Sequence, residues 1–169
     1  MNRSFIFLVP DVYKRQDLQT IFDIERNTFP PQEAACLETF AYRLKNFPEC
    51  FFVAENDEGI IVAFLSGRPA LRLTGQGVTD DMYENIQLPS GDTFVILSVN
   101  TRPDFQNMGY ASGLLSHAAC TAKKLGCRRM LLACKEEKLS FYGRAGYVST
   151  GVSDSCHGGA VWYDMTMDL

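Results

Sequence analysis

The chain has 169 residues, of which 46% are hydrophobic and 21% are charged, and its formal net charge is −4. That length suits a single domain over residues 1–169 with a sizeable core, while the acidic balance argues against nucleic acid, which usually binds a basic face. No stretch approaches the length of a membrane-spanning helix, so we expect no membrane partner either.

Cysteine and histidine usage narrows the chemistry further. The six cysteines include no C-x-x-C pair and only two histidines are present, so we expect no metal site. Most of the cysteines lie in apolar runs, where a free thiol behaves as a small hydrophobic group. This usage indicates a reduced, cytoplasmic protein.

The N-terminal segment, residues 1–16, fits the rest of the chain poorly. Arg3 precedes an apolar run, but the run is too short for a signal peptide and no small-residue cleavage site follows. We expect a strand at Phe5–Val9. As a hypothesis, part of this segment is non-native, which sequencing the locus again would test.

Two helices are predicted next. Asp17 is a suitable N-cap for the first helix, which Pro30-Pro31 end. Its helical rhythm is carried by Leu18, Ile21, Phe22, Ile24 and Glu25. The second helix is expected from Gln32 to Asn46, and Pro48 ends it.

Strands dominate the middle of the chain. The β-rich runs 50–55 and 60–67 are joined by N-D-E-G, which predicts a hairpin. Residues 68–92 predict a long irregular connection with one helical turn near 80–85, and loops of that length are often functional. The remaining predictions are strands at 93–100, 128–134, 147–153 and 160–167, and helices at 111–125 and 136–146. This order predicts an α/β fold with a mixed sheet and helices on both faces.

The stretch RPDFQNMGYASGLL, residues 102–115, joins a predicted strand to a predicted helix. The first backbone N–H groups of a helix lack partners within it, and their partial positive charge suits a phosphate or pyrophosphate. Gly109 would let the ligand approach the backbone, Ala111 would keep the first turn clear, and Gln106 could donate a hydrogen bond. The alternative is a glycine-containing loop before a core helix, since neither G-K-[ST] nor G-x-G-x-x-G is present.

Residues Val95–Tyr147 resemble the GNAT acetyltransferases, on two motifs in the expected order. Gln106–Ala111 matches the pattern [RQ]-x-x-G-x-[GA], which binds the pyrophosphate of acetyl-CoA in that family. Phe141–Tyr147 matches a short helix with an aromatic pair that ends in glycine and an aromatic residue. Over roughly residues 17–169, segments such as RLKNFPE, VAFLSGRP and HGGAVWYDM are similar to the serotonin (arylalkylamine) N-acetyltransferase branch, particularly its microbial relatives.

This resemblance implies a GNAT fold, with a mostly antiparallel sheet of six to seven strands, and an acyltransferase that uses acetyl-CoA. In the family the fourth strand separates from the fifth and exposes backbone groups to the pantetheine arm, which here would be Val99–Thr101. The implied cofactor-binding residues are Val99, Asn100, Thr101, Gln106, Asn107, Met108, Gly109, Tyr110, Ala111, Ser112 and Phe141. Lys123, Lys124 or Arg128 could reach the adenine-side phosphate, or could simply form a solvated helix face.

Acetyl transfer needs an acid for the leaving thiolate and a base for the amine. The resemblance gives Tyr142 the acid role, with mere packing on the cofactor as the alternative. Vertebrate serotonin acetyltransferases carry two histidines where this chain has Val95 and Leu97, and neither can accept a proton. Glu33 and His157 are the candidate replacements, each with a solvated surface role, or for Glu33 a first-turn helix role, as its alternative.

The resemblance implies a small primary amine as the acceptor. The substrate pocket would lie between the Phe29–Glu33 turn, the 68–92 loop and the end of the sheet. The implied substrate-binding residues are Phe29, Pro31, Val95 and Leu97. Their apolar character favours an arylalkyl amine. The alternatives are a protein or peptide N-acetyltransferase, which would need an open acidic groove, and a non-catalytic CoA-binding sensor. We expect a monomer or homodimer.

Overall fold

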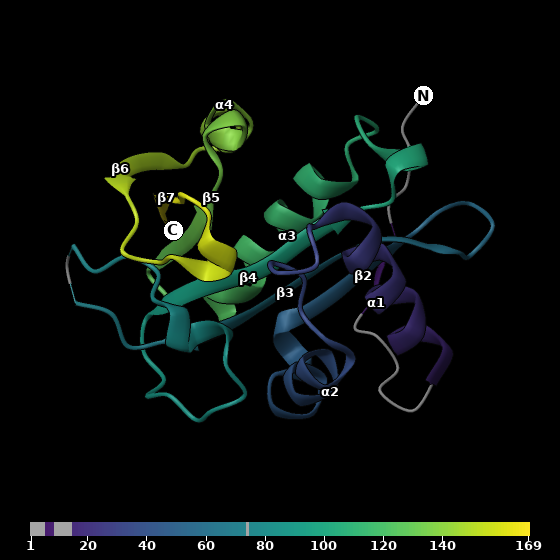
Figure 1. Ribbon diagram of the computed structural model, residues 1–169, viewed down its shortest axis with the longest axis horizontal. Helices are drawn as coiled ribbons and strands as arrows, with labels where there is room; N and C mark the ends of the chain where they lie inside the picture. The colour runs from purple at the N-terminus through teal and green to yellow at the C-terminus, as the bar shows by residue number, and fades with distance from the viewer. Residues whose placement is uncertain (1–5, 9–14, 74) are drawn as a thin grey trace. The chain divides into compact units, whose positions relative to one another are not determined.

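The computed structural model describes residues 6–8, 15–73 and 75–169 (Figure 1). The chain forms two compact units, the first made of the chain up to Ser66 together with Ser98–Ala118. The second comprises Gly67–Leu97 and Ala119–Leu169. The expectation of a single domain over the whole chain stays a prediction.

A sheet provides the frame of the fold. Its strands are β1 (Ile6–Leu8), β2 (Phe51–Glu55), β3 (Ile61–Ala70), β4 (Thr93–Thr101), β5 (Arg129–Cys134), β6 (Val148–Val152) and β7 (Tyr163–Asp168). The strand order among the described residues is β1-β2-β3-β4-β5-β7-β6. β4 and β5 are parallel, whereas β1–β2, β2–β3, β5–β7 and β6–β7 are antiparallel. The predicted mixed, mostly antiparallel fold class is confirmed.

The helices begin at other residues than the sequence predicted. They are α1 (Arg15–Thr28), α2 (Leu37–Asn46), α3 (Tyr110–Lys124) and α4 (Leu139–Arg144). Asp17 therefore lies in the first turn of α1 instead of capping it, where its carboxylate still favours the positive helix end. α2 starts at Leu37 and not at Gln32, because the amides of Glu33 and Ala34 both bond to the Pro30 carbonyl in a turn.

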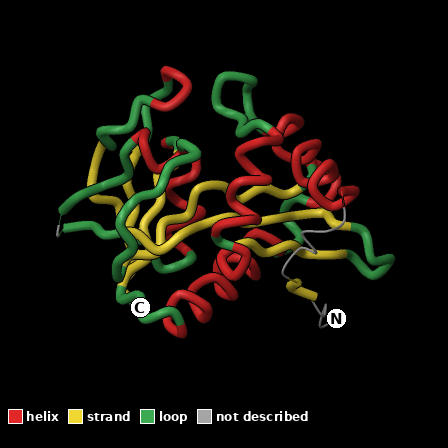
Figure 2. Tube along the Cα trace, turned by 90° about the horizontal axis from the view of Figure 1, so that it is seen from below, coloured by secondary structure: helices red, strands yellow, loops and turns green. Residues whose placement is uncertain are grey.

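The first unit has helices on both faces of its strands (Figure 2). Consecutive strand residues point to opposite faces, and Phe51 and Phe52 of β2 show the two environments. Phe51 packs with Phe40 of α2 and Phe64 of β3, at centroid separations of 6.1 and 5.9 Å, in a cluster that includes α1. Phe52 instead meets His117 of α3 at 4.9 Å.

The connection between β3 and β4, residues 71–92, lies in the second unit and is irregular, as predicted. It contains a short 3-10 helix, Asp80–Tyr83, at the place where the sequence predicted a helical turn. Val78 and Met82 of this connection pack with Val95, Leu97 and Leu131 in an apolar cluster. The connection is therefore a packed part of the second unit.

The hairpin predicted around N-D-E-G is also confirmed, because β2 and β3 flank the turn at residues 56–60. The side chain of Asn56 accepts the amides of Glu58 and Ile60 at 3.1 and 2.9 Å. Gly59 has φ 73°, a conformation that favours glycine. None of the described helices is both long and apolar enough to cross a membrane.

Candidate functional site

The turn between β4 and α3 has an unusual backbone. Asn107 and Gly109 have φ values of 59° and 91°, and Asn107 is the one non-glycine residue with positive φ in the described chain. Two left-handed positions separated by one residue reverse the chain sharply before α3 begins at Tyr110. The whole segment 106–109 is exposed to solvent.

The amides of this turn point away from internal acceptors. The Gly113 amide donates to the Gly109 carbonyl at 2.9 Å, which opens the hydrogen-bonding pattern of α3. Within the described residues, no hydrogen-bond acceptor serves the amides of Asn107, Met108, Gly109, Ala111 and Ser112. Such a row of N–H groups at the positive end of a helix suits phosphate groups in general, and the predicted pyrophosphate contact here stays a prediction.

Three side chains brace the same turn. The Gln106 side-chain amide donates to the Thr101 carbonyl at 3.3 Å, so it ties the turn to the end of β4. The predicted bond from Gln106 to a bound anion stays a prediction. Tyr110 is buried, with its ring edge-on to Phe105 at 6.2 Å. The Arg102 guanidinium lies over the Phe105 ring, 5.4 Å from its centroid.

The end of β4 offers backbone groups to a ligand. Pairing of β4 with β5 ends at Val95 and Leu131, although β4 continues to Thr101. Ile96 and Leu97 thus have no β5 partner among the described residues, which is the strand separation that the resemblance implied. The Thr101 hydroxyl is buried and has no hydrogen-bond partner in the described chain.

Sequence reasoning missed a buried polar pair in the first unit. Glu25 of α1 is 1% exposed and accepts the side-chain amide of Asn100. It also accepts the backbone amide of Ala35 at 3.0 Å. Asn100 therefore turns its side chain into the protein, so any contact with a cofactor would come from its backbone. The sequence did carry one signal for this pair, because Glu25 lies four residues after Ile21 and so shares the apolar face of the predicted helix.

The predicted acceptor turn follows α1. Phe29 is half-buried and Pro31 is exposed. Glu33 is buried, so the alternative of a solvated surface role is wrong for this residue. The first-turn helix role is wrong too, because α2 begins only at Leu37.

Tyr142 lies on α4 in the second unit and is buried. Its ring meets Phe141 and Tyr147 at centroid separations of 5.0 and 5.8 Å. Burial raises the pKa of the Tyr142 hydroxyl far above its usual range, and nearby Cys134, Tyr147 and Tyr83 raise it further. A phenol is already protonated at physiological pH, so this shift makes the hydroxyl a weaker acid in the closed protein, and the acid role of Tyr142 stays a prediction.

The second candidate base belongs to an aromatic cluster in the same unit. The His157 ring stacks on Tyr83 at 4.6 Å with an interplanar angle of 25°. The His157 carbonyl accepts the Trp162 indole N–H at 2.9 Å. Of the two predicted substrate residues on β4, Val95 is fully buried in the apolar cluster, whereas Leu97 is 9% exposed. Val95 therefore contributes to the core, which corrects its predicted contact with the substrate.

The remaining predicted positions carry less information. Lys123, Lys124 and Arg128 are exposed, as a solvated helix face requires. Within the described residues, no group of three or more potential ligand side chains is placed to hold a metal ion.

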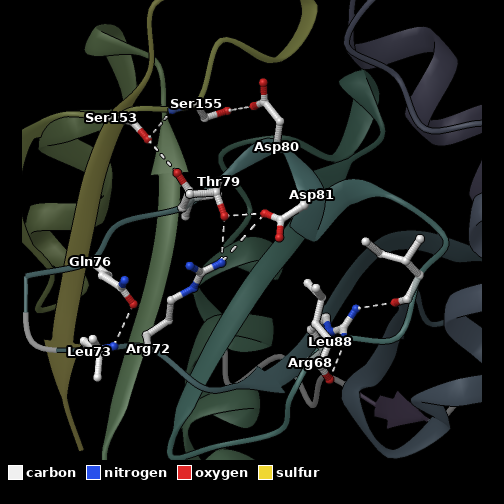
Figure 3. A network of polar contacts seen from close by, with 12 residues as sticks. Arg68, Arg72, Leu73, Gln76, Thr79, Asp80, Asp81, Leu88, Ser153 and Ser155 are labelled. Atoms are coloured by element: carbon white, nitrogen blue, oxygen red, sulfur yellow. Dashed lines mark hydrogen bonds and ion pairs between the residues drawn. The ribbon is translucent and has the colours of Figure 1, made fainter.

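Two arginines hold the connection 71–92 in place (Figure 3). Arg68 of β3 is 1% exposed and donates to the carbonyls of Ile86 and Leu88 at 3.2 and 3.4 Å. Arg72 donates to the Thr79 hydroxyl at 2.7 Å, and lies 4.0 Å from the Asp81 carboxylate. Both arginines bind within the connection and so fix its path.

The segment after β6 holds the same connection from another side. Ser155 donates to Asp80 at 2.6 Å, a bond that lowers the pKa of this carboxyl group. Ser153 donates to the Val78 carbonyl at 3.3 Å (Figure 3). The sequence gave no local signal for these contacts, because the partners are 75 residues apart.

Asp164 of β7 completes this arrangement. It is buried and accepts the Val78 amide at 3.1 Å, while burial raises the pKa of its carboxyl group. A Cβ atom on Gly77 would lie 1.6 Å from an Asp164 carboxylate oxygen. Only glycine therefore fits at position 77 while Asp164 keeps its place.

Comparison with known proteins adds the following. The family model described as acetyltransferase (GNAT) family matches residues 18–147. No curated protein matches the chain.

Several solved structures are similar at low sequence identity. A chain of the NatC complex bound to Gag peptide and CoA is 13% identical, with a TM-score of 0.76 and coverage of 98% of this chain and 99% of that one. The GphF GNAT-like decarboxylase in complex with isobutyryl-CoA is 15% identical, with a TM-score of 0.77 and 99% coverage of both chains. Ard1 from Thermoplasma volcanium is 17% identical, with a TM-score of 0.73 and coverage of 98% and 97%. These likenesses concern the fold.

Substitution of Gly77 tests the link between Asp164 and the connection. Gly77→Ala should displace the Asp164 carboxylate and release the Val78 amide, so exchange of that amide should accelerate by about tenfold in hydrogen–deuterium exchange. Gly143→Ala is the matched control, since no atom lies within 4 Å of a Cβ at that position. Unchanged protection of Val78 in Gly77→Ala would contradict this role of Asp164.

Proposed function

Because the chain belongs to the acetyltransferase (GNAT) family and its cosubstrate is acetyl-CoA, we propose that it transfers the acetyl group to a small arylalkylamine-like primary amine. The observation that carries the proposal is the row of amides at residues 107–109 and 111–112, which lack acceptors within the described chain. The cytoplasmic setting stays a prediction from cysteine usage.

The amide row supports a pyrophosphate site. Anions are stabilised there by direct N–H donation and by the positive end of α3. The left-handed φ of Gly109 keeps the backbone open at the centre of the row, and its missing side chain lets an anion approach. Asn107, Met108, Tyr110, Ala111 and Ser112 would contribute backbone groups.

The separated end of β4 supports a site for the pantetheine arm. An amide-containing chain needs backbone partners, and pairing to β5 has already ended at Val95. We assign Val99, Asn100 and Thr101 to this contact through their backbone atoms. The buried Thr101 hydroxyl adds one donor and acceptor that no described residue satisfies. Phe141 is proposed as an apolar contact of the same ligand.

Acetyl-CoA supplies an activated thioester. The attacking amine must be neutral, so a group of the protein or a water must accept its proton. Glu33 and His157 are the candidates, and the burial of Glu33 favours a role inside a site. Tyr142 is proposed as the acid that protonates the departing sulfur. Its place in the aromatic helix motif of α4, beside Phe141 and Tyr147, supports this role.

The apolar surroundings support an aromatic acceptor. Leu97 lies in the cluster with Met82, and Tyr83 and Leu88 pack against it. Tyr83 also stacks on His157, which adds aromatic side chains next to this cluster in the second unit. Phe29 and Pro31 stay predicted substrate contacts. The likeness to the serotonin acetyltransferase branch supports the same class of substrate.

Two other functions have specific support. The NatC complex, one chain of which has a similar fold, was solved with Gag peptide and CoA bound, which supports a peptide as a second candidate substrate. The absence of histidine at Val95 and Leu97 favours a CoA-binding sensor that does not catalyse transfer, whereas the retained Tyr142 opposes it. The length of the connection and the packing of Val78 and Met82 in the apolar cluster favour a closed pocket over an open groove.

An acceptor panel separates these functions. Purified protein is mixed with acetyl-CoA and with phenethylamine, tryptamine, polyamines or N-terminal peptides, and release of the CoA thiol is measured. We expect release with the arylalkylamines. Release only with peptides would favour the peptide acetyltransferase, and tight CoA binding without any release would favour the sensor.

Substitution of Gly109 tests the amide row. Gly109→Val should weaken CoA binding by at least about tenfold in calorimetry, because a branched side chain strains a positive φ and covers the amides. Gly126→Val is the matched control, since Gly126 has φ 81° beyond the other end of α3. It imposes similar strain without blocking the row. Retained CoA affinity in Gly109→Val would place the pyrophosphate elsewhere.

Removal of the Tyr142 hydroxyl tests the acid. Tyr142→Phe should lower kcat by about 10²-fold or more, the usual scale of general acid catalysis, with little change in CoA affinity. Tyr147→Phe removes a second buried hydroxyl in the same aromatic group and should leave kcat within about twofold. An unchanged kcat in Tyr142→Phe would remove its acid role.

A further inference from the structure

Glu25 stands at the junction of three segments of the first unit. It lies in the last turn of α1, and its main-chain carbonyl accepts the Phe29 amide at 2.9 Å. One side-chain oxygen accepts the Ala35 amide, and the other accepts the Asn100 side-chain amide. A single carboxylate thus joins α1, the segment 29–35 and the end of β4.

Burial makes this junction rigid. Glu25 is 1% exposed and Asn100 is 9% exposed. Hydrogen bonds to a carboxylate are stronger than those between neutral groups, and an N–H group deprived of its partner inside a protein carries the full cost of desolvation. Each of the two side chains would be costly to bury without a partner, and the hydrogen bond between Glu25 and Asn100 offsets that cost for both.

The joined segments are those proposed to bring the two substrates together. The segment 29–35 carries Phe29, Pro31 and Glu33 on the acceptor side. Asn100 lies between Val99 and Thr101, whose backbone is proposed to hold the pantetheine arm. We propose that Glu25 is a positioning residue that fixes the acceptor segment relative to the cofactor-binding end of β4. This role rests on the proposed function.

Glu25 acts through its neighbours and does not take the proton of the amine. Both of its oxygens already accept N–H groups, and its side chain is enclosed. Its effect is on the separation of the reacting groups, and small displacements of that kind reduce the rate strongly.

A reciprocal exchange tests the junction. Asn100→Asp sets two carboxylates against each other, which should expel Glu25 and release the Ala35 amide. Glu25→Gln keeps an oxygen for Ala35, and its new N–H₂ group can donate to Asn100 once that amide turns over. The double variant Glu25→Gln/Asn100→Asp restores an N–H···O bond with donor and acceptor exchanged.

Hydrogen–deuterium exchange of the Ala35 amide is the first measurement. We expect Asn100→Asp to accelerate exchange by about tenfold, and both Glu25→Gln and the double variant to remain within about threefold of the unmodified protein. Ser98→Ala is the matched control, because it removes a buried polar contact with Arg43 from the same face of β4. It should leave Ala35 protected. A double variant as unprotected as Asn100→Asp would overturn the junction.

Coupling to the cofactor end is the second measurement, and it needs no turnover. Saturating CoA should slow exchange of Ala35 in the unmodified protein and in the double variant, but not in Asn100→Asp. Where phenethylamine is acetylated, Asn100→Asp should raise its KM and lower kcat, and the double variant should recover both. Loss of Ala35 protection without any effect on CoA coupling or on these constants would overturn the positioning role.

Failure of the proposed function gives a different result. CoA would then produce no protection at residues 107–112 and no amine would release thiol. The exchange of Ala35 in the four variants would still decide whether Glu25 joins the segment 29–35 to β4.

Discussion

The first turn of a helix cannot satisfy its own amides, and the proposed coenzyme site depends on that constraint. At the start of α3 these amides have no acceptor within the described residues. They follow a solvent-exposed turn in which Asn107 and Gly109 have positive φ. The opposite end of α3 is closed by Gly126, which also adopts positive φ. Positive φ thus occurs at both ends of α3. Before the helix it shapes the turn of the proposed coenzyme site, and after the helix it ends the helix at Gly126.

Buried polar side chains supply the second constraint. Glu25 ties Ala35 and Asn100 together in the first unit, and Asp164 ties Val78 to β7 in the second. In each unit a carboxylate holds an irregular segment that has little regular hydrogen bonding of its own. Buried backbone polar groups outside helices and strands need such partners, so Glu25 and Asp164 contribute to the shape of these segments, together with Arg68 and Arg72 in the second unit.

Features set by residues close together in the sequence were predicted correctly. The hairpin followed from polar turn residues, and Asn56 and Gly59 indeed form that turn. The fold class followed from the order of strands and helices. The start of α2 did not follow, because the Ala35 amide is drawn to Glu25 on another helix and Leu37 becomes the first helical residue.

Parts of the candidate site were equally beyond sequence reasoning. The turn at Gly109 was predictable because its glycine and flanking strand lie within a few residues of each other. Arg68, Arg72 and Asp164 gave no signal, because their partners were set by the path of the connection 71–92. Glu25 and Asn100 are 75 residues apart, and neither residue type alone indicates the other. Val95 was placed at the substrate by alignment with the histidines of the vertebrate serotonin acetyltransferases, but it packs with Val78 and Met82 of the connection and is fully buried.

The contact between Gly77 and Asp164 limits how this protein can diverge. Any side chain at position 77 collides with the carboxylate of Asp164, and any shortening at position 164 leaves the Val78 amide without its acceptor. Glycine at position 77 and a side-chain acceptor at position 164 are therefore required together. Libraries that diversify the connection to alter acceptor preference would therefore retain more folded members if both positions were held constant.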